Sequence, residues 1–383
     1  MNMFRRLLLL LVMIQPAHNA LSSHSKPLKV LHLSFHLGCV KEFEMVGKEL
    51  GLDVTPWYVL ANKESHDRFD PSSASSWNAV YNIGHARAQC IWEHNKDYFD
   101  QFDVIVTSDT APLSRVFLQN NWQKPLIIWI CNRFDYCDQG SLDCRFPDAE
   151  YYDLIRKAAH KKNVSIVGYV AYEHFYAKSK GVDTGDLIIK PCGTLEGTTR
   201  NSQESYISKN IKKNNTFFIP PRLEPHQVNH LISKCKQLGI DTYCGSYNGP
   251  ADLKDFKGVI NFPYAWSNLA LFENIQLGLP IFVPTVRFLN ELAGSRESHL
   301  YRFFTFANFE YSEWYCPEHK DIFIYFDSWQ DLQKKAQTID FIALKEKTKA
   351  FGMRHKQEML NRWIGVFDNA RTILKKITTV SMF

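Results

Sequence analysis

Glu273 is a single acidic residue in the apolar run FENIQLGLPIFVPT, which covers residues 272–285. Gly278, Pro280 and bulky aliphatic residues follow it, so the run is typical of a helix that ends at the glycine and leads into a buried strand. A carboxylate here can accept two hydrogen bonds from a vicinal diol such as a ribose. The alternative is that Glu273 is only a solvated helix residue and that Gly-x-Pro merely ends the helix.

The residues before Glu273 indicate a binding site for phosphate. The strand-like GVINFP comes first, and YAWSNLALFENIQLGLP then begins a helix whose first turns have unpaired backbone N–H groups near Ser267, Asn268 and Leu269. In CGSYNGP, Tyr247 could contact a base or ribose, although YNG is also an ordinary turn. Together these residues predict that a nucleotide binds to the second half of the chain.

Candidate acid–base residues lie in the first half. His36 comes directly after the predicted strand KVLHLSF, and Asp109 follows DVIVTS. Residues at the carboxyl ends of parallel strands face the ligand crevice, so His36 or Asp109 could take a proton from an acceptor hydroxyl. The alternatives are a structural loop histidine for His36 and, for the loop with Asp109, capping of the next helix through Asp109 or Thr110.

The run FENIQLGLPIFVP resembles the nucleotide-sugar motif of GT-B glycosyltransferases, which have a Glu, a few small or apolar residues, then Gly-x-Pro and a strand. The general layout of that family matches nearly the whole chain, and the motif itself covers about twenty residues. The resemblance implies transfer of a sugar from a nucleotide-sugar donor, UDP- or GDP-linked, to a hydroxyl acceptor on a glycan, protein or lipid. The donor would bind the C-terminal domain and the acceptor the N-terminal domain. No cofactor and no metal are expected, since the Asp-x-Asp signature is absent from the sequence.

Two positions depart from the family pattern. Retaining members often carry a second Glu eight residues before the first, where this chain has Ala265. Members also carry an Arg and a downstream Lys that face the diphosphate. Arg222 stands after FFIPP, but His226 and Gln227 occupy the downstream positions, so Arg222 would act alone. The stereochemical outcome stays open.

Strand-like and helix-like segments alternate along the chain, which predicts an α/β fold with doubly wound parallel sheets. We expect GT-B architecture, with two Rossmann-like domains that face a cleft and a C-terminal helix that returns to the N-domain. The expected parts are an acceptor domain, a polar linker, a nucleotide-sugar domain and the returning helix, at residues 28–195, 196–214, 215–352 and 353–378.

Length and composition fit two domains with large cores. The chain has 383 residues, of which 45% are hydrophobic, and its net charge of +5 comes without a basic block. Nucleic acid is therefore not an expected partner. No Cys or His spacing resembles a zinc site.

Residues 1–20 have two arginines, a short apolar stretch and then small or polar residues, the layout of a signal peptide or a signal anchor. Entry into the lumen of the secretory pathway or export is expected, with possible membrane association through the N-terminus. Nine cysteines are present, and Cys137 and Cys144 are the best disulfide pair in an oxidising compartment. Buried free thiols are the alternative. Asn163 and Asn214 are acceptors of N-glycosylation by pattern.

Two other classes of protein fit part of the pattern. A two-lobed exported solute-binding protein would also have two Rossmann-like lobes behind a signal peptide, but it would not need the Glu and Gly-x-Pro at a helix. The second of these classes is another nucleotide-sugar enzyme, such as an epimerase. Nicotinamide binding is disfavoured because SFHLGC lacks the Gly-x-Gly-x-x-Gly spacing.

Overall fold

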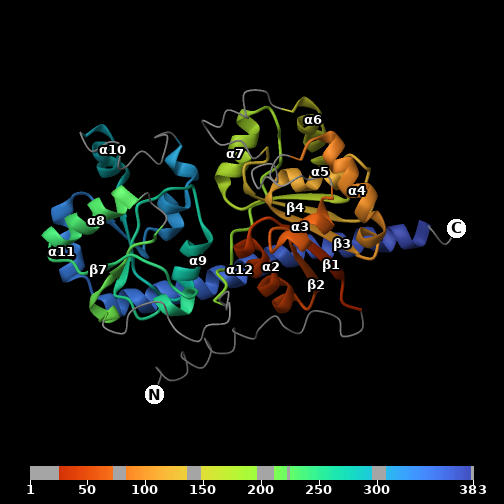
Figure 1. Ribbon diagram of the computed structural model, residues 1–383. Helices are drawn as coiled ribbons and strands as arrows, with labels where there is room; N and C mark the ends of the chain where they lie inside the picture. The colour runs from red at the N-terminus through yellow and green to blue at the C-terminus, as the bar shows by residue number, and fades with distance from the viewer. Residues whose placement is uncertain are drawn as a thin grey trace, which may run out of the picture.

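The computed structural model describes residues 26–71, 83–135, 148–195, 211–221, 225–295 and 308–380. The predicted signal segment, the Cys137–Cys144 pair and Arg222 lie outside the described residues. Figure 1 shows two α/β domains side by side, each with a sheet between helices.

The first domain contains a five-stranded parallel sheet in the order β2-β1-β3-β4-β5. Its elements are β1 (Lys29–Ser34), α2 (Leu37–Leu50), β2 (Asp53–Tyr58), α3 (Lys63–Phe69), α4 (His85–Phe99), β3 (Val104–Thr110), η3 (Ala111–Ser114), α5 (Arg115–Leu118), β4 (Leu126–Asn132), α6 (Ala149–Ala158), β5 (Val164–Gly168) and α7 (Ala171–Ser179).

The second domain contains another five-stranded parallel sheet, in the order β10-β9-β8-β6-β7. Its elements are η5 (Lys213–Asn215), β6 (Phe217–Phe218), α8 (Pro225–Gln237), β7 (Thr242–Tyr243), η6 (Pro250–Leu253), β8 (Gly258–Ile260), α9 (Leu269–Gln276), β9 (Ile281–Pro284), α10 (Val286–Gly294), η8 (Phe309–Tyr311), η9 (Glu313–Tyr315), η10 (Pro317–His319), β10 (Phe323–Phe326), α11 (Trp329–Thr338) and α12 (Phe341–Val380).

Each domain is doubly wound with the same strand order, because the second sheet repeats the order 2-1-3-4-5 of the first when its strands are counted from β6. The central strand β4 forms from the apolar run LIIWIC, which suits burial on both faces of a sheet, and all seven residues of β3 are buried. The predicted fold class, two Rossmann-like parallel-sheet domains in tandem, is confirmed.

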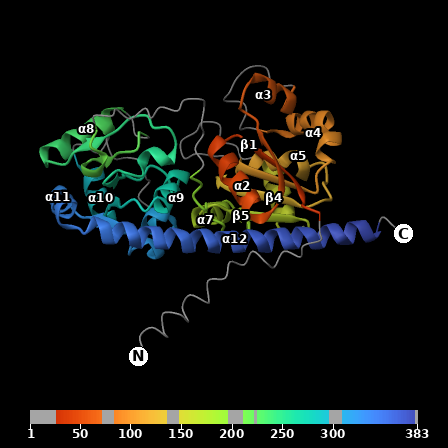
Figure 2. The same cartoon turned by 90° about the horizontal axis from the view of Figure 1, so that it is seen from below.

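The last helix, α12, has 40 residues and runs along both domains, as Figure 2 shows from below. It packs against α9 of the second domain and α2 of the first. Trp363, which is completely buried, makes edge contacts with Phe43 of α2 and Trp129 of β4, each with ring centroids 5.5 Å apart. The predicted return of the terminal helix to the first domain is confirmed, and the helix already begins at Phe341. Among the described residues, no helix combines the length and the apolar character needed to cross a membrane.

A buried carboxylate holds the segment that leaves the first domain. Glu42 of α2 is 1% exposed, and its two carboxylate oxygens accept hydrogen bonds from Cys192 N at 2.5 Å and Thr194 N at 2.9 Å. Gln276 of α9 donates to Cys192 O at 2.8 Å. Helices from both domains therefore hold the same few residues. Burial raises the pKa of Glu42 to about 7, although the backbone N–H groups oppose the shift.

We expect Glu42→Gln to change how stability depends on pH. A carboxyl whose pKa is higher in the folded state than in the unfolded chain destabilises the fold when it is ionised, and this effect is relieved as the pH falls from about 7 toward about 4.5. The free energy of unfolding of wild type relative to Glu42→Gln should therefore rise by about 2–3 kcal/mol between about pH 8 and about pH 5. Urea denaturation of both proteins at both pH values measures this difference. A difference that does not change with pH would show that Glu42 titrates normally.

Candidate functional site

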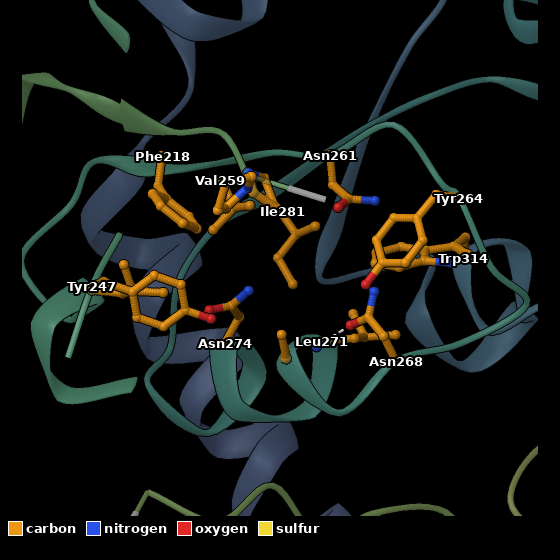
Figure 3. Close-up of a pocket in the computed structure, with 14 residues that line it drawn as sticks. Phe218, Tyr247, Val259, Asn261, Tyr264, Asn268, Leu271, Asn274, Ile281 and Trp314 are labelled. Atoms are coloured by element: carbon orange, nitrogen blue, oxygen red, sulfur yellow. Dashed lines mark hydrogen bonds between the residues drawn. The ribbon is translucent and has the colours of Figure 1, made fainter. Parts of the chain in front are cut away.

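Both sheets have a switch point, where the strand order reverses and where doubly wound domains bind ligands outside the carboxyl ends of the strands. In the first domain this point lies between β1 and β3, and in the second between β6 and β8. The predicted residues His36 and Asp109 follow or end the first pair of strands. The pocket in Figure 3 is lined by residues from the ends of the second pair.

His36 is exposed and caps the first turn of α2. Its Nδ1 accepts a hydrogen bond from Cys39 N at 3.3 Å, and its own backbone N–H donates to Ser34 Oγ at 3.1 Å. Since Nδ1 serves as an acceptor, the neutral ring carries its proton on Nε2. In this arrangement His36 can donate a hydrogen bond to a ligand through Nε2.

Asp109 is 5% exposed and lies near the end of β3. Its backbone φ is 70°, in the left-handed region that residues other than glycine adopt rarely. Asn132 Nδ2 donates to its Oδ1 at 3.3 Å. Burial raises the pKa of Asp109 to about 7, and the neighbouring Cys39 raises it further, while His36 opposes the shift. A carboxyl group that titrates near neutral pH can act as a general base. Of the two residues that could cap the next helix, Thr110 is the N-cap residue of η3, and no side chain makes the capping hydrogen bond there.

The pocket of the second domain is small and lined mostly by apolar and aromatic side chains, among them Phe218, Tyr247, Tyr264 and Trp314. Its free volume is about 20 Å³, which is room for about one water molecule. Figure 3 shows the rings of Tyr247 and Tyr264 on opposite sides, with their hydroxyl groups directed inward. A larger ligand would have to move these rings.

Two amide groups in this pocket have atoms without hydrogen-bond partners among the described residues. Asn261, just after β8, is 3% exposed and its Nδ2 has no acceptor. Asn274 of α9 is 5% exposed and its Oδ1 has no donor. Buried polar atoms are normally paired, so a donor and an acceptor left open in one aromatic pocket favour a polar ligand.

The predicted residues of α9 are distributed between the pocket and its surroundings. Asn268 lines the pocket and caps α9, since its Oδ1 accepts from Leu271 N at 2.7 Å. Glu273 is half-buried and does not line this pocket, whereas the next residue, Asn274, does. The lining residues of α9 are Ala270, Leu271 and Asn274. Glu273 lies three residues after Ala270, so it is next to this face of the helix without lining the pocket.

The switch points of the two domains meet at α9. A Cβ atom on Gly38 of α2 would come within 2.4 Å of Leu269 Cδ1 on α9, so any larger residue would require the Leu269 side chain to move. Ser267 lies beside the Tyr169 hydroxyl of the first domain. Trp266 makes an edge contact with Tyr172 of α7 at 4.1 Å between ring centroids. The start of α9, with Ser267 and Asn268, therefore abuts the edge of the first domain where His36 lies.

A third cluster could be mistaken for a metal site. The ligand atoms of Glu313, Cys316 and Glu318 lie within 4.8 Å of one another. The Lys190 ammonium lies 2.9 Å from Glu313 and 2.5 Å from Glu318, and it is 3.9 Å from Cys316 Sγ. These charges raise the pKa of Lys190 despite its burial. A lysine thus already supplies the positive charge, and the cluster is an ion-pair contact between the domains.

Sequence reasoning missed Asn261, Asn274 and Cys39. Asn261 had a usable signal, because it is a polar residue at the carboxyl end of an apolar strand, like Asp109. The role of Asn274 depends on the rotation of a short helix, which the sequence does not specify.

No family model and no curated protein matches the sequence. Solved structures of similar arrangement include the calicheamicin glycosyltransferase CalG4, with 9% identity and a TM-score of 0.45 over 92% of this chain and 100% of that one. UGT89C1 of Arabidopsis thaliana, complexed with UDP, has 10% identity and a TM-score of 0.47 over 91% and 100%. UDP-GlcNAc 2-epimerase of Neisseria meningitidis has 9% identity and a TM-score of 0.44 over 90% and 100%. At 9–10% identity these structures do not establish an activity for this chain, and its function depends on its own residues.

Proposed function

We propose that this protein is a glycosyltransferase that moves a sugar from a nucleotide-sugar donor to a hydroxyl group of a glycan, protein or lipid. The observation that carries the proposal is the meeting of the two switch points. The pocket with its open amides and the start of α9 lie on one side, and His36 and Asp109 lie on the other. A donor bound along α9 would present its reactive sugar to the first domain.

Each group at the two switch points has its own role in the proposed transfer. Asp109 is the general base that takes the proton of the acceptor hydroxyl, because its pKa of about 7 suits proton transfer near neutral pH. His36 donates a hydrogen bond through Nε2 to the acceptor or the sugar. Backbone N–H groups at the start of α9 bind the diphosphate, with Arg222 as the proposed cation beside it. These groups would stabilise the charge of the leaving diphosphate, so transfer requires no metal.

The donor is UDP- or GDP-linked in this proposal. Glu273 accepts hydrogen bonds from the ribose, and Tyr247 and Asn274 contact the base. The protein enters the secretory pathway through residues 1–20. Of the two glycosylation patterns, Asn214 is exposed and can carry a glycan. Asn163 Nδ2 already donates to Trp122 O at 2.8 Å and Lys124 O at 3.1 Å, so the folded site opposes modification there.

Donor binding can be tested by titrating UDP, GDP, ADP and CMP into the protein in a calorimeter. One nucleoside diphosphate should bind and also raise the melting temperature. Glu273→Gln should weaken its binding by about 1–3 kcal/mol, through loss of charge-assisted hydrogen bonds. Asn274→Leu should weaken it as well, since the pocket then lacks an acceptor.

Glu273→Gln and Asn274→Leu change adjacent residues of α9, so each variant serves as a control for the other. If only Asn274→Leu weakens binding, the ribose assignment to Glu273 is wrong while the pocket stays the binding site. If a nucleotide sugar binds but no nucleoside diphosphate is released when acceptors are present, the protein is a binding protein rather than a transferase. No binding of any nucleotide would contradict the proposed function.

A further inference from the structure

Four aromatic rings meet where α7 of the first domain faces the second domain, and the proposed function uses none of them. The rings of Tyr172 and Trp266 are in edge contact, with their centroids 4.1 Å apart. The rings of Phe175 and Tyr311 are stacked, with their centroids 4.3 Å apart and their planes inclined by 20°. Tyr172 and Trp266 are buried, and Phe175 and Tyr311 are half-buried. Two ring pairs therefore join the domains through one face of α7, since residues three apart are neighbours on a helix.

The first-domain half of this contact is held in place by charged groups. The guanidinium carbon of Arg133, which follows β4, lies 5.0 Å from the centroid of the Tyr172 ring. Arg133 Nη1 also donates to a carboxylate oxygen of Glu173 at 2.9 Å, and Glu173 is 1% exposed. A cation near the face of an aromatic ring attracts it. The ion pair and the cation–π contact together fix the position of Tyr172 at the start of α7.

The second-domain half consists of two segments that are bound to each other. Trp266 O accepts hydrogen bonds from Glu313 N at 2.9 Å and from Ser312 Oγ at 3.2 Å. Ser312 follows Tyr311 directly, so these bonds couple the position of Tyr311 to that of Trp266. The two rings that face α7 are therefore parts of one hydrogen-bonded unit.

The same two segments line the pocket of the second domain. Tyr264 and Trp314 are lining residues of that pocket, as Figure 3 shows. Tyr264 lies two residues before Trp266, and Trp314 lies three residues after Tyr311. Trp314 Nε1 donates to Ala265 O at 2.8 Å, which joins the segments a second time. The contact with α7 is thus built on the backbone that also shapes the pocket.

This ring contact and α12 connect the domains on different sides. In Figure 1, α12 crosses the lower part of the boundary between the domains, and α7 lies at its upper part. The helix α12 passes through the boundary as one continuous element, whereas the four rings are held together by packing. The ring contact can therefore separate without unfolding a helix.

We propose that these four rings form a latch that holds the two domains together on the side away from α12. The loss of one aromatic pair changes an equilibrium by roughly 2- to 10-fold. A latch with one ring pair removed should therefore be open more often by this factor. The latch belongs to the protein without a ligand and does not depend on the proposed transferase activity, so either can fail while the other stands.

Hydrogen exchange followed by mass spectrometry tests the latch in the whole protein. The readout is the first turn of α2 around Gly38, which faces Leu269 across the domains and contains no latch residue. Exchange that requires a local opening reports the population of the open form. We expect Phe175→Ala and Tyr311→Ala each to speed this exchange by roughly 2- to 10-fold. The double variant should exchange no faster than the single ones, because each change removes the same ring pair.

Two controls separate a latch from a general loss of stability. Tyr311→Phe keeps the ring and should exchange like wild type. Tyr98→Ala removes another half-buried ring, whose contacts include Trp57 and Phe102 of the same domain. This variant should also leave the exchange around Gly38 unchanged.

Three results would overturn the proposal. The first is wild-type exchange around Gly38 in both Phe175→Ala and Tyr311→Ala. The second is an equal acceleration in Tyr98→Ala, and the third is a double variant in which the two single effects multiply. If Phe175→Ala does not fold, Phe175→Leu takes its place, since it keeps an apolar side chain but has no ring.

Discussion

Asp109→Asn is expected to lower turnover by roughly 10²–10⁴-fold, the range for loss of a positioned general base, while nucleotide affinity stays at the wild-type value. The amide keeps the shape of the side chain and its hydrogen bond with Asn132, but it cannot take a proton. Because the residue would act on the acceptor in the transition state, the donor ground state is unaffected. Initial rates and calorimetric donor affinity measured on the same preparations separate the two effects.

The pH dependence gives a second readout of the same assignment. A base must be ionised to work, so kcat/KM should rise as the pH increases through the Asp109 pKa of about 7 and level off above it. Asp109→Asn should lose this rise. His36→Ala should lower turnover less, since it removes one hydrogen-bond donor and leaves the base in place.

His85→Ala is the matched control for His36→Ala. His85 begins α4, is exposed, and is paired with Glu150 at 2.7 Å. Its removal should leave the rate unchanged. Wild-type rates in both Asp109→Asn and His36→Ala would refute the assignment of the base to the first domain. A loss of nucleotide binding in these variants would show that the donor also contacts the first domain.

Trp363→Ala should destabilise the protein by about 3–5 kcal/mol, the usual cost of truncating a buried tryptophan to alanine. The ring is completely buried and fills the space between α2, β4 and α12, with Phe43 and Trp129 against it. Its loss leaves a cavity and weakens the contact that fixes α12 to the first domain. Urea denaturation followed by circular dichroism measures the free energy of unfolding.

Met353→Ala provides the control on the same helix, because Met353 is 62% exposed and should change the stability by less than about 0.5 kcal/mol. A Trp363→Ala protein as stable as this control would mean that α12 does not depend on the first domain. Trp363→Phe should fall between the two, since it keeps an aromatic ring in the same space.

The sequence predicted the architecture because its long apolar strands are unambiguous. LIIWICN is an almost continuous apolar run and VIVTSDT begins with one, and neither has helical periodicity, so both indicate central strands of a parallel sheet. The short helix α3 was not assigned, because seven residues give only a weak periodic signal.

The part of the candidate site that lies at the ends of strands could be predicted from the sequence. His36 and Asp109 were found because they follow or end strands, and the same rule points to Asn261. The sequence does not determine rotations and contacts across the fold. It gives no reason why Asn274 rather than Glu273 lines the pocket. The left-handed backbone of Asp109 was equally invisible.

The chain passes between the domains twice, once after β5 and once within α12, and the two passages touch. His355 Nε2 lies 2.8 Å from Pro191 O, and Lys190 N donates to Met359 Sδ at 3.2 Å. Because the two passages lie at one place, a rotation of one domain against the other would turn about these residues. The contact between Gly38 and Leu269 would then separate, and the space between the two switch points would become accessible from solvent. In the proposed transferase, entry of an acceptor and release of product would therefore both depend on the same few residues around Pro191.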